Sequence, residues 1–361
     1  MSEETSQAYR IHLHERGPAS ADIIKCNLKL EEVPKQHPRA GQILVRMRAA
    51  ALNYRDLLVA TDDERYKSRT AAPLVPLCDG AGTVERVGAT APGSPSRWKP
   101  GDRVIFAAGT SWKSAEPGTD AEMDITSLLG AGDIDGLLQQ YVVAEGDALV
   151  PAPEGLSFEE AAALGVAHGT AWNALFGWYR PLKEGDVVVT QGTGGVSTAV
   201  LQIAVAAGAK VIALSSSPEK LEVAKQLGAA HALDSNDPEW DTKILELTGG
   251  RGADHVVDVV GAPTIHRSLR ATRKGGLVSA VGFLGGSENH GDLIPEIVFS
   301  AKTVRGIVYA SIPMLEDLSA FVQKHGIKPI IGHVFEWNEA SEAYAALLNL
   351  NTSGKIVIRI P

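Results

Sequence analysis

A glycine-rich turn placed directly after a buried strand is the feature that most constrains this sequence. The strand is predicted at 186–190, a largely apolar run of the kind that a sheet covered by helices on both faces requires. The turn consists of Gly192, Thr193, Gly194, Gly195, Val196 and Ser197. A helix is predicted to follow from Thr198 to Ala207, so backbone N–H groups and the helix dipole can meet a pyrophosphate. A purely structural tight turn is the alternative, but this context favours dinucleotide binding.

Strands and helices continue to alternate after the turn. Further strands are predicted at 210–214, 255–260, 277–281 and 304–309. Helical segments fit between most of them, which is the pattern of a doubly wound parallel sheet. We therefore predict an α/β Rossmann domain here, with Ser197 as the small residue that lets its first helix pack closely on the strand.

The residues before 153 follow a different pattern. Short strand-like runs at 42–47, 82–87 and 102–106 stand beside Gly and Pro turn signals, which predicts a twisted antiparallel or barrel-like unit. Ser157 and Glu160 are spaced as a capping box, so a helix is expected to start there and to run to about residue 178.

Chain length sets the number of domains. A chain of 361 residues is expected to form two globular units. We place a mainly-β catalytic domain at 1–165 and the Rossmann domain at 166–309. The final residues, 310–361, are expected to return to the first domain, ending in a strand at 355–359.

An acidic segment interrupts the first domain at 107–137. Six acidic residues stand there against the single Lys113, a local charge of −5. Such a segment is either a solvated surface loop or a lid over a pocket. As a lid it would repel polyanions such as acyl-CoA, which would make neutral substrates the expected class.

Charge and composition exclude several functions. A net charge of −9 without any basic run argues against nucleic-acid binding. Cys26 and Cys78 are the two cysteines of the chain, too few for a disulfide framework or a four-cysteine zinc lobe. The polar, acidic N-terminus does not resemble a secretory signal, and no run approaches the roughly 20 apolar residues of a membrane helix. A cytoplasmic protein is expected.

The choice of dinucleotide depends on the end of the second Rossmann strand. NAD enzymes place an acid there, against the ribose hydroxyls. This sequence has Ser215 and Ser216, with Lys220 shortly after, and these groups can bind a 2′-phosphate. The same residues also suit an ordinary helix start, with Ser217 as N-cap and Pro218 in the first turn. We favour NADP(H).

Several short motifs, taken in order, resemble one family. They are Ala51–Asp56, Asp79–Val84, Lys99–Val104, Gly169–Leu175, Gln191–Ser197 and Gly354–Val357. Their spacing resembles the medium-chain dehydrogenase/reductase superfamily, in its zinc-free branch of quinone oxidoreductase-like and alcohol dehydrogenase-like proteins. The resemblance covers nearly the whole chain. It implies a GroES-like catalytic domain joined to a Rossmann domain.

The resemblance also locates the positions where zinc-dependent members hold their catalytic metal. This sequence offers Asn53, then Cys78 with Asp79, then Val166 at those positions. One thiol and one neighbouring carboxylate cannot form the three-ligand site that catalytic zinc needs, so we predict no metal. His12 and His14 are expected to have packing or surface roles.

A metal-free site favours some reactions over others. In an enone or quinone, hydride from the nicotinamide arrives at an activated carbon while charge develops on a carbonyl oxygen that hydrogen bonds can stabilise. We therefore expect a zinc-independent, NADPH-dependent reductase of quinones or α,β-unsaturated carbonyl compounds. Two alternatives remain: a metal-free alcohol dehydrogenase or carbonyl reductase, and a non-catalytic NADPH-binding protein.

Three residues are candidates for the catalytic groups. Tyr54 follows a lost ligand position that faces the nicotinamide in the resembling fold, and it could donate a hydrogen bond or a proton or only line the pocket. Asn53 could orient the carbonyl or bond to backbone. His168 could act as an acid, although a histidine at a helix start is more often a packing or capping residue. Asp56 is expected to be structural and could pair with Arg55.

The remaining cofactor contacts are expected at the carboxyl ends of later strands, where open sheets bind ligands. The candidates are Gly261, Gly282, Phe283, Val308 and Tyr309, and the resemblance adds Thr170 near the nicotinamide. The last of these segments often pairs with its mate in the resembling family, so a homodimer is expected.

Overall fold

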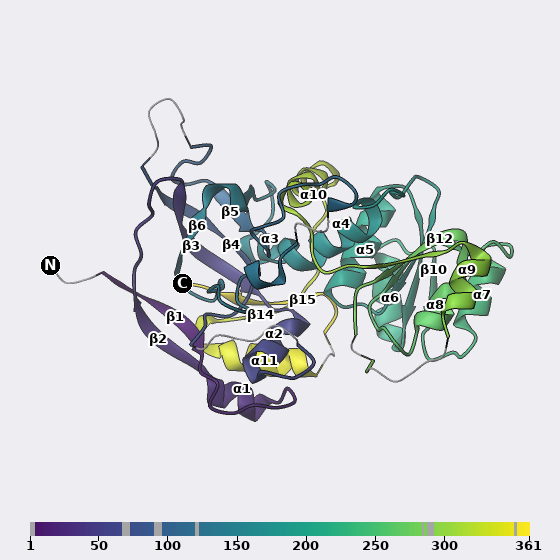
Figure 1. Cartoon of the computed structure of the whole chain (residues 1–361), viewed down its shortest axis with the longest axis horizontal. Helices are drawn as coiled ribbons and strands as arrows, with labels where there is room; N and C mark the ends of the chain where they lie inside the picture. Colours follow the sequence, from purple (N-terminus) through teal and green to yellow (C-terminus); the bar gives the residue numbers. More distant parts are fainter. Residues whose placement is uncertain are drawn as a thin grey trace. The chain divides into compact units, whose positions relative to one another are not determined.

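The computed structural model describes residues 4–66, 73–89, 96–119, 123–283, 285–286, 292–349 and 352–361 (Figure 1). By their contacts, the residues divide into two compact units. Unit 1 is Met1–Gly169 with Ala310–Pro361, and unit 2 is Thr170–Tyr309. The first three residues of the polar N-terminus and residues 120–122 of the acidic segment lie outside the described residues.

A seven-stranded sheet forms the frame of unit 1. Its order is β14-β15-β3-β4-β5-β7, and β6 pairs with β3. The strands are β3 (Gln42–Ala51), β4 (Asp79–Val87), β5 (Arg103–Phe106), β6 (Tyr141–Glu145), β7 (Leu149–Pro151), β14 (Ile331–Phe335) and β15 (Lys355–Arg359). All pairs are antiparallel except β14 with β15. The predicted mainly-β unit is confirmed, and β15 brings the end of the chain into it.

The register at the end of β3 determines which residues meet there. Ala51 pairs with Asp79 on one side and with Val357 on the other. Because β3 and β15 are antiparallel, the residues just after Ala51 lie opposite those just before Val357. The end of β3 is therefore flanked by the first residues of β4 and of β15.

Helices and a separate ribbon complete unit 1. The ribbon pairs β1 (Thr5–Ile11) with β2 (Leu28–Pro34) and is purple in Figure 1. The helices are α1 (Ala21–Asn27), α2 (Tyr54–Thr61), α3 (Phe158–Ala162), α10 (Ile312–His325) and α11 (Ala340–Leu348). Helices α1, α2 and α11 pack together beside the sheet (Figure 1). Within the described part of the chain, no helix has the length and apolar character that a membrane crossing requires.

The acidic segment 107–137 is anchored by buried apolar residues. Trp112, Ala131 and Leu137 are at most 1% exposed. The backbone N–H of Ile312 donates to the carbonyl of Trp112 at 3.1 Å, which ties the segment to the start of α10. The segment is thus more than a solvated loop, and its residues line a cavity described below.

Unit 2 is a six-stranded parallel sheet with the order β10-β9-β8-β11-β12-β13. Its strands are β8 (Val187–Gln191), β9 (Lys210–Ser215), β10 (His231–Asp234), β11 (Ala253–Asp258), β12 (Thr272–Ala280) and β13 (Thr303–Gly306). Its helices are α4 (Gly169–Phe176), α5 (Gly195–Ala206), α6 (Pro218–Gln226), α7 (Trp240–Leu247), α8 (Ile265–Ala271) and α9 (Ile294–Ser300). The first residue of α4, Gly169, still belongs to unit 1. Val189, Ile212, Trp240 and Val256 share one buried core. The doubly wound parallel sheet is confirmed.

Local structure departs from the sequence predictions at several places. The capping box forms as predicted, since Ser157 Oγ accepts from Glu160 N at 3.1 Å and Glu160 Oε2 accepts from Ser157 N at 2.7 Å. The helix that it starts is not continuous, however, because a π-helical turn at 164–168 separates α3 from α4. Strand β13 ends at Gly306, before the predicted end at 309, and strand β11 ends at Asp258, before the predicted 260.

Candidate active site

The candidate catalytic residues of unit 1 lie at the start of α2, directly after β3. The carboxylate of Asp56 accepts a hydrogen bond from Asn53 N at 2.7 Å and fixes this helix start. Asp56 is fully buried, and burial raises its pKa, while the neighbouring Arg55 opposes that shift. Arg55 Nε lies 3.3 Å from Asp56 Oδ1, so the expected pair forms. Asp56 thus supports the helix start.

The positions that correspond to zinc ligands come together beside this helix. Asn53 Nδ2 donates to Asp79 Oδ2 at 2.9 Å and lies 3.9 Å from Cys78 Sγ. The other carboxylate oxygen of Asp79 accepts from Val166 N at 2.7 Å. Val166 lies in the π-helical turn, a distortion that often marks functional sites. The Cβ of any other residue at Gly165 would stand 2.5 Å from Asp79 Oδ1, so glycine allows this approach.

A lysine that the sequence interpretation missed completes the cluster. Lys355 Nζ donates to Leu52 O at 2.6 Å, to Asn53 Oδ1 at 2.6 Å and to Asp79 Oδ2 at 2.9 Å. The side chains of Lys355 and Asp79 are 4% and 0% exposed. One signal was present in the sequence: a lysine stands directly before the apolar run 356–358 of the terminal strand, and a buried lysine requires a partner.

The cluster does not fit a catalytic zinc ion. The cluster offers one thiol, that of Cys78, and one carboxylate, that of Asp79, which is fewer than the three ligands that catalytic zinc needs. The carboxylate of Asp79 is already paired with the ammonium of Lys355, and the side-chain amide of Asn53 is hydrogen-bonded to both. Val166 contributes a backbone N–H, which is a donor and cannot bind a metal ion. Among the described residues, no three His, Cys, Asp or Glu side chains are grouped in a way that could hold a metal ion.

The two N-terminal histidines are engaged with each other and with a carboxylate. The rings of His12 and His14 stack with centroids 5.7 Å apart. His12 Nε2 lies 2.6 Å from Glu31 Oε1 on the neighbouring strand.

Tyr54, the first residue of α2, has a cationic neighbour that the sequence did not indicate. Arg65 Nη1 donates to the phenol oxygen of Tyr54 at 3.5 Å. Asp63 holds the guanidinium through bonds of 2.9 Å to Nε and 2.8 Å to Nη2. Because the phenol oxygen accepts from Arg65, its O–H can donate to another acceptor, such as a carbonyl oxygen.

His168 ends the π-helical turn and is 1% exposed. Its Nδ1 lies 3.2 Å from the carbonyl oxygen of Ala163, one turn earlier. This burial and local bond match the packing alternative.

Unit 2 has a candidate site of its own, the glycine turn. Gly192 has φ +76°, and its N–H donates to Leu214 O at 2.6 Å, which ties the turn to β9. A Cβ added at Gly192 or Gly194 would meet nothing within 4 Å, so the space beside the turn is open to a ligand. Ser197 Oγ donates to Gln191 O at 2.5 Å and holds α5 against β8. The turn therefore fits a dinucleotide pyrophosphate at the start of α5.

A buried hydrogen-bond chain links this turn to the loop after β11. Gln191 Nε2 donates to Ser268 Oγ at 2.9 Å, and Ser268 Oγ donates to Asp258 Oδ2 at 2.6 Å. The other oxygen of Asp258 accepts from Val260 N at 3.0 Å and from Gly261 N at 2.8 Å. Asp258 is fully buried. One carboxylate thus holds two of the predicted cofactor segments in a fixed arrangement.

Gly261 and Gly282, predicted to contact the cofactor, also allow a close approach of two loops. A Cβ at Gly282 would stand 1.8 Å from Val259 O, and one at Gly261 would stand 2.7 Å from Gly282 O. These glycines therefore let the loops after β11 and β12 approach each other. Phe283, the next residue, is 50% exposed.

Thr170, Val308 and Tyr309 lie together in unit 2. Thr170 Oγ1 donates to Val308 O at 3.4 Å. The side-chain amide of Asn173 donates to Tyr309 O at 2.6 Å. Tyr309 is 1% exposed, while Val308 is 45% exposed. Of this group, Val308 presents its side chain to the surface.

The candidate 2′-phosphate residues lie at the end of β9 and the start of α6. Ser215 is buried, Ser216 is exposed and Lys220 is partly buried. Ser217 caps α6, as its alternative interpretation predicted, and its hydroxyl lies 2.5 Å from a Glu219 carboxylate oxygen. The sequence interpretation gave Glu219 no role. Its charge stands close to the predicted phosphate-binding groups.

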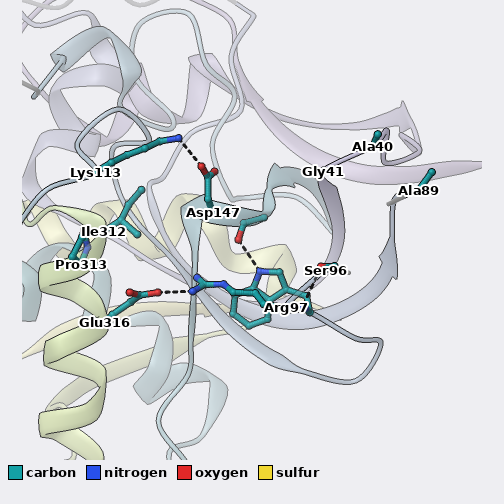
Figure 2. A pocket seen from close by; sticks show the side chains of 12 residues that line it. Ala40, Gly41, Ala89, Ser96, Arg97, Lys113, Asp147, Ile312, Pro313 and Glu316 are labelled. Carbon is teal, nitrogen blue, oxygen red and sulfur yellow. Dashed lines mark hydrogen bonds and ion pairs between the residues drawn. The ribbon is translucent and has the colours of Figure 1, made fainter. Parts of the chain in front are cut away.

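Unit 1 also contains two cavities. Figure 2 shows one of about 740 Å³, bordered by two ion pairs. Arg97 Nη1 meets Glu316 Oε1 at 2.7 Å, and Lys113 Nζ meets Asp147 Oδ2 at 2.6 Å. The other, of about 300 Å³, is lined in part by Ala107, Thr110, Leu129 and Ile134 of the acidic segment. No sequence-predicted site residue lines either cavity.

A mainly-β unit with a buried polar cluster, joined to a parallel sheet with an open glycine turn, defines a dinucleotide-dependent oxidoreductase. Two family models match the chain: "Alcohol dehydrogenase GroES-like domain" over residues 39–154 and "Zinc-binding dehydrogenase" over residues 195–324. The chain belongs to the medium-chain dehydrogenase/reductase superfamily. Its GroES-like domain, predicted from the resemblance, is confirmed.

Relatives extend over nearly the whole chain. A zinc-type alcohol dehydrogenase-like protein of Schizosaccharomyces pombe is 40% identical over 91% of this chain and 93% of its own length. An acryloyl-coenzyme A reductase of Sulfurisphaera tokodaii is 28% identical over 93% of this chain and 97% of its own. A solved structure from Sinorhizobium meliloti, described as an alcohol dehydrogenase, has a TM-score of 0.85 at 36% identity and covers 100% of both chains.

Proposed function

We propose that this oxidoreductase is a zinc-independent, NADPH-dependent reductase that transfers hydride to a quinone or to an α,β-unsaturated carbonyl compound. The observation that carries the proposal is the bonding of Lys355 to Asp79 and Asn53, because it gives the cluster at the zinc-ligand positions a cation from the chain itself. Without a Lewis acid, conjugate reduction is favoured over reduction of an isolated ketone, in which full alkoxide charge develops on oxygen.

The proposed chemistry is divided between the two units. The glycine turn and the segments held by Asp258 would bind the cofactor, which supplies the hydride. Tyr54 would donate a hydrogen bond to the carbonyl oxygen as charge develops there. Arg65, bonded to the same phenol oxygen, would stabilise that charge through Tyr54. The S. tokodaii relative, by its name, acts on a conjugated acyl compound, which is compatible with this reaction class.

The preference for NADPH is part of the proposal. The end of β9 has Ser215 and Ser216 where an NAD enzyme has an acid, and Lys220 follows in the first turn of α6. Glu219 works against a phosphate at this place, and its bond with Ser217 keeps its carboxylate at the helix cap. Michaelis constants measured in parallel for NADPH and NADH would show which of these opposing charges determines the cofactor preference.

Three further properties belong to the proposal. The acidic segment favours a neutral substrate over a polyanion. Val304 in the terminal strand β13 and Val308, two residues beyond its end, are 38% and 45% exposed, which favours a homodimer paired through that edge. The cytoplasm remains the proposed compartment.

Product analysis with a single enone tests the proposed reaction. Purified protein is incubated with NADPH and the enone, and a quinone and an enoyl-CoA are assayed in parallel. The proposal expects the saturated ketone as product and NADPH consumption with the quinone. Allylic alcohol would instead indicate a metal-free carbonyl reductase. Tight NADPH binding without turnover on any acceptor would indicate a non-catalytic NADPH-binding protein.

A further inference from the structure

The ammonium of Lys355 has a complete set of acceptors. Its three N–H groups meet the carbonyl oxygen of Leu52, the side-chain oxygen of Asn53 and the carboxylate of Asp79. All three acceptors lie within 2.9 Å of Nζ. This arrangement suits an ammonium, which has three donors and one positive charge.

The charge of Lys355 is needed because Asp79 is fully buried. A buried carboxylate without a cation is strongly unfavourable, and removing one partner of a buried pair leaves the other uncompensated. Catalytic zinc needs three protein ligands, whereas these positions offer one thiol, a carboxylate already paired with Lys355 and the amide of Asn53.

The contacts of Lys355 also reach the start of α2. Leu52 and Asn53 are the two residues that precede Tyr54, and Lys355 binds an oxygen of each. Asn53 is further held through its backbone N–H by Asp56 and through its amide nitrogen by Asp79. The phenol of Tyr54 is therefore carried by a helix start whose preceding residues are fixed by the lysine.

We propose that Lys355 is a positioning residue that takes the place of the metal in this member of the family. Its ammonium balances Asp79 and fixes Leu52 and Asn53, and so holds Tyr54 where the proposed reaction needs it. Asn53 then acts as part of this support and does not bind the substrate carbonyl. The positioning of Tyr54 by Lys355 rests on the proposed function, whereas the charge balance between Lys355 and Asp79 does not.

The test compares Lys355→Met with Lys35→Met. Lys35 is a matched control in the same unit, with a side chain 7% exposed and paired with Glu4 at 3.0 Å, away from the cluster. We expect Lys355→Met to lower kcat by roughly tenfold to a hundredfold, through misplacement of Tyr54, with a smaller change in the KM for NADPH. Its melting temperature should fall by about 5 °C or more. Lys35→Met should keep its kcat.

A double variant separates charge balance from positioning. Lys355→Met with Asp79→Asn removes both charges, so its melting temperature should recover most of the loss, while kcat stays low. This variant also keeps the test valid if Lys355→Met alone does not fold. Wild-type kcat in Lys355→Met, or an equal loss in Lys35→Met, would overturn the positioning role.

Metal content provides a readout that is independent of activity. Elemental analysis of wild-type protein purified without chelators should find substoichiometric zinc, and added zinc should leave its melting temperature unchanged. One zinc per chain, or stabilisation by zinc, would overturn the replacement. If the wild type reduces no quinone or enone, the proposed function fails, yet zinc content and the melting temperatures of the single and double variants still test the charge-balancing role.

Discussion

The hydroxyl of Ser268 donates to the carboxylate of Asp258 at 2.6 Å and accepts from the side chain of Gln191 at 2.9 Å. Asp258 ends β11 and Gln191 ends β8, so this serine joins two strands at the edge where a dinucleotide is expected. Both linked loops carry predicted cofactor residues, Gly192 and Gly261. Breaking the hydrogen bonds among Gln191, Ser268 and Asp258 should therefore weaken cofactor binding.

Asp258→Asn should raise the KM for NADPH by about tenfold, with a smaller effect on kcat. The amide keeps the size of the carboxylate but has one acceptor oxygen for the several donors of the site, so the loop of Gly261 loses support. Steady-state kinetics measure the effect. Asp317→Asn, at an exposed position of α10, is the control and should change neither constant. An unchanged KM in Asp258→Asn would show that the network does not position the cofactor.

Lys220→Ala should raise the KM for NADPH by about tenfold and leave that for NADH nearly unchanged. The reason is that the ammonium is proposed to meet the 2′-phosphate, which NADH does not have. Lys225→Ala, in the last turn of the same helix, is the control for a lost surface charge. Equal changes for both cofactors would remove Lys220 from the phosphate site.

Tyr54→Phe should lower kcat on an enone by about a hundredfold, because it removes the proposed donor to the carbonyl oxygen. Arg65→Met should lower kcat less, because Arg65 is proposed to act on the substrate oxygen only indirectly, through its hydrogen bond to Tyr54. Tyr179→Phe, whose side chain is exposed in unit 2, serves as control. If kcat is unchanged in Tyr54→Phe, the hydroxyl of this tyrosine takes no part in the reaction and the residue only lines the site.

Stability should fall on acidification because of His255. This residue of β11 is 1% exposed, and burial lowers its pKa, while Asp186 at 3.7 Å opposes that effect in part. The unfolded chain, with a histidine pKa of about 6.5, binds the proton more readily than the folded protein. The neutral, buried His255 therefore leaves the free energy of unfolding at its full value above about pH 6.5, and this free energy falls progressively below that pH.

Melting temperatures measured between pH 7.5 and pH 5 test this contribution. His255→Gln should show a shallower decline than the wild type over that range. His231→Gln, at the exposed start of β10, is the control and should follow the wild-type curve. Identical curves for the wild type and His255→Gln would exclude a contribution from this histidine.

Val304→Lys should convert the proposed dimer into a monomer. The substitution places a charge on the outer strand of the parallel sheet, a device that natural proteins use to prevent pairing of edges. Light scattering after size exclusion gives the mass, to be compared with 38.1 kDa for one chain. Leu247→Lys, at a similarly exposed leucine of α7, should leave the mass unchanged. A monomeric wild type would refute the dimer.

Much of the fold was predictable because its signals are local. The apolar runs of β8 and β9 and the glycine turn between β8 and α5 are each encoded by neighbouring residues. The capping box of Ser157 and Glu160 is equally local. Helix α2 was missed because it has eight residues, too few to give a clear helical period, and follows a strand directly.

The candidate site was only partly predictable because its key contacts are not local. Asn53, Cys78, Asp79 and Val166 could be grouped from the resemblance, and the structure brings them together. Lys355 lies 276 residues from Asp79, and no periodicity or spacing relates the two. Arg65 is close in sequence to Tyr54, but it lies in a loop whose path the sequence pattern does not specify.

The place of β15 in the sheet has a consequence for how the protein is made. Unit 2, residues 170–309, leaves the ribosome before Lys355 is synthesised, so it can fold while unit 1 still lacks its closing strand. Until that strand arrives, Asp79 has no cation and β3 has an unpaired edge. The polar cluster is therefore among the last parts of the molecule to form, and a nascent chain cannot acquire it early.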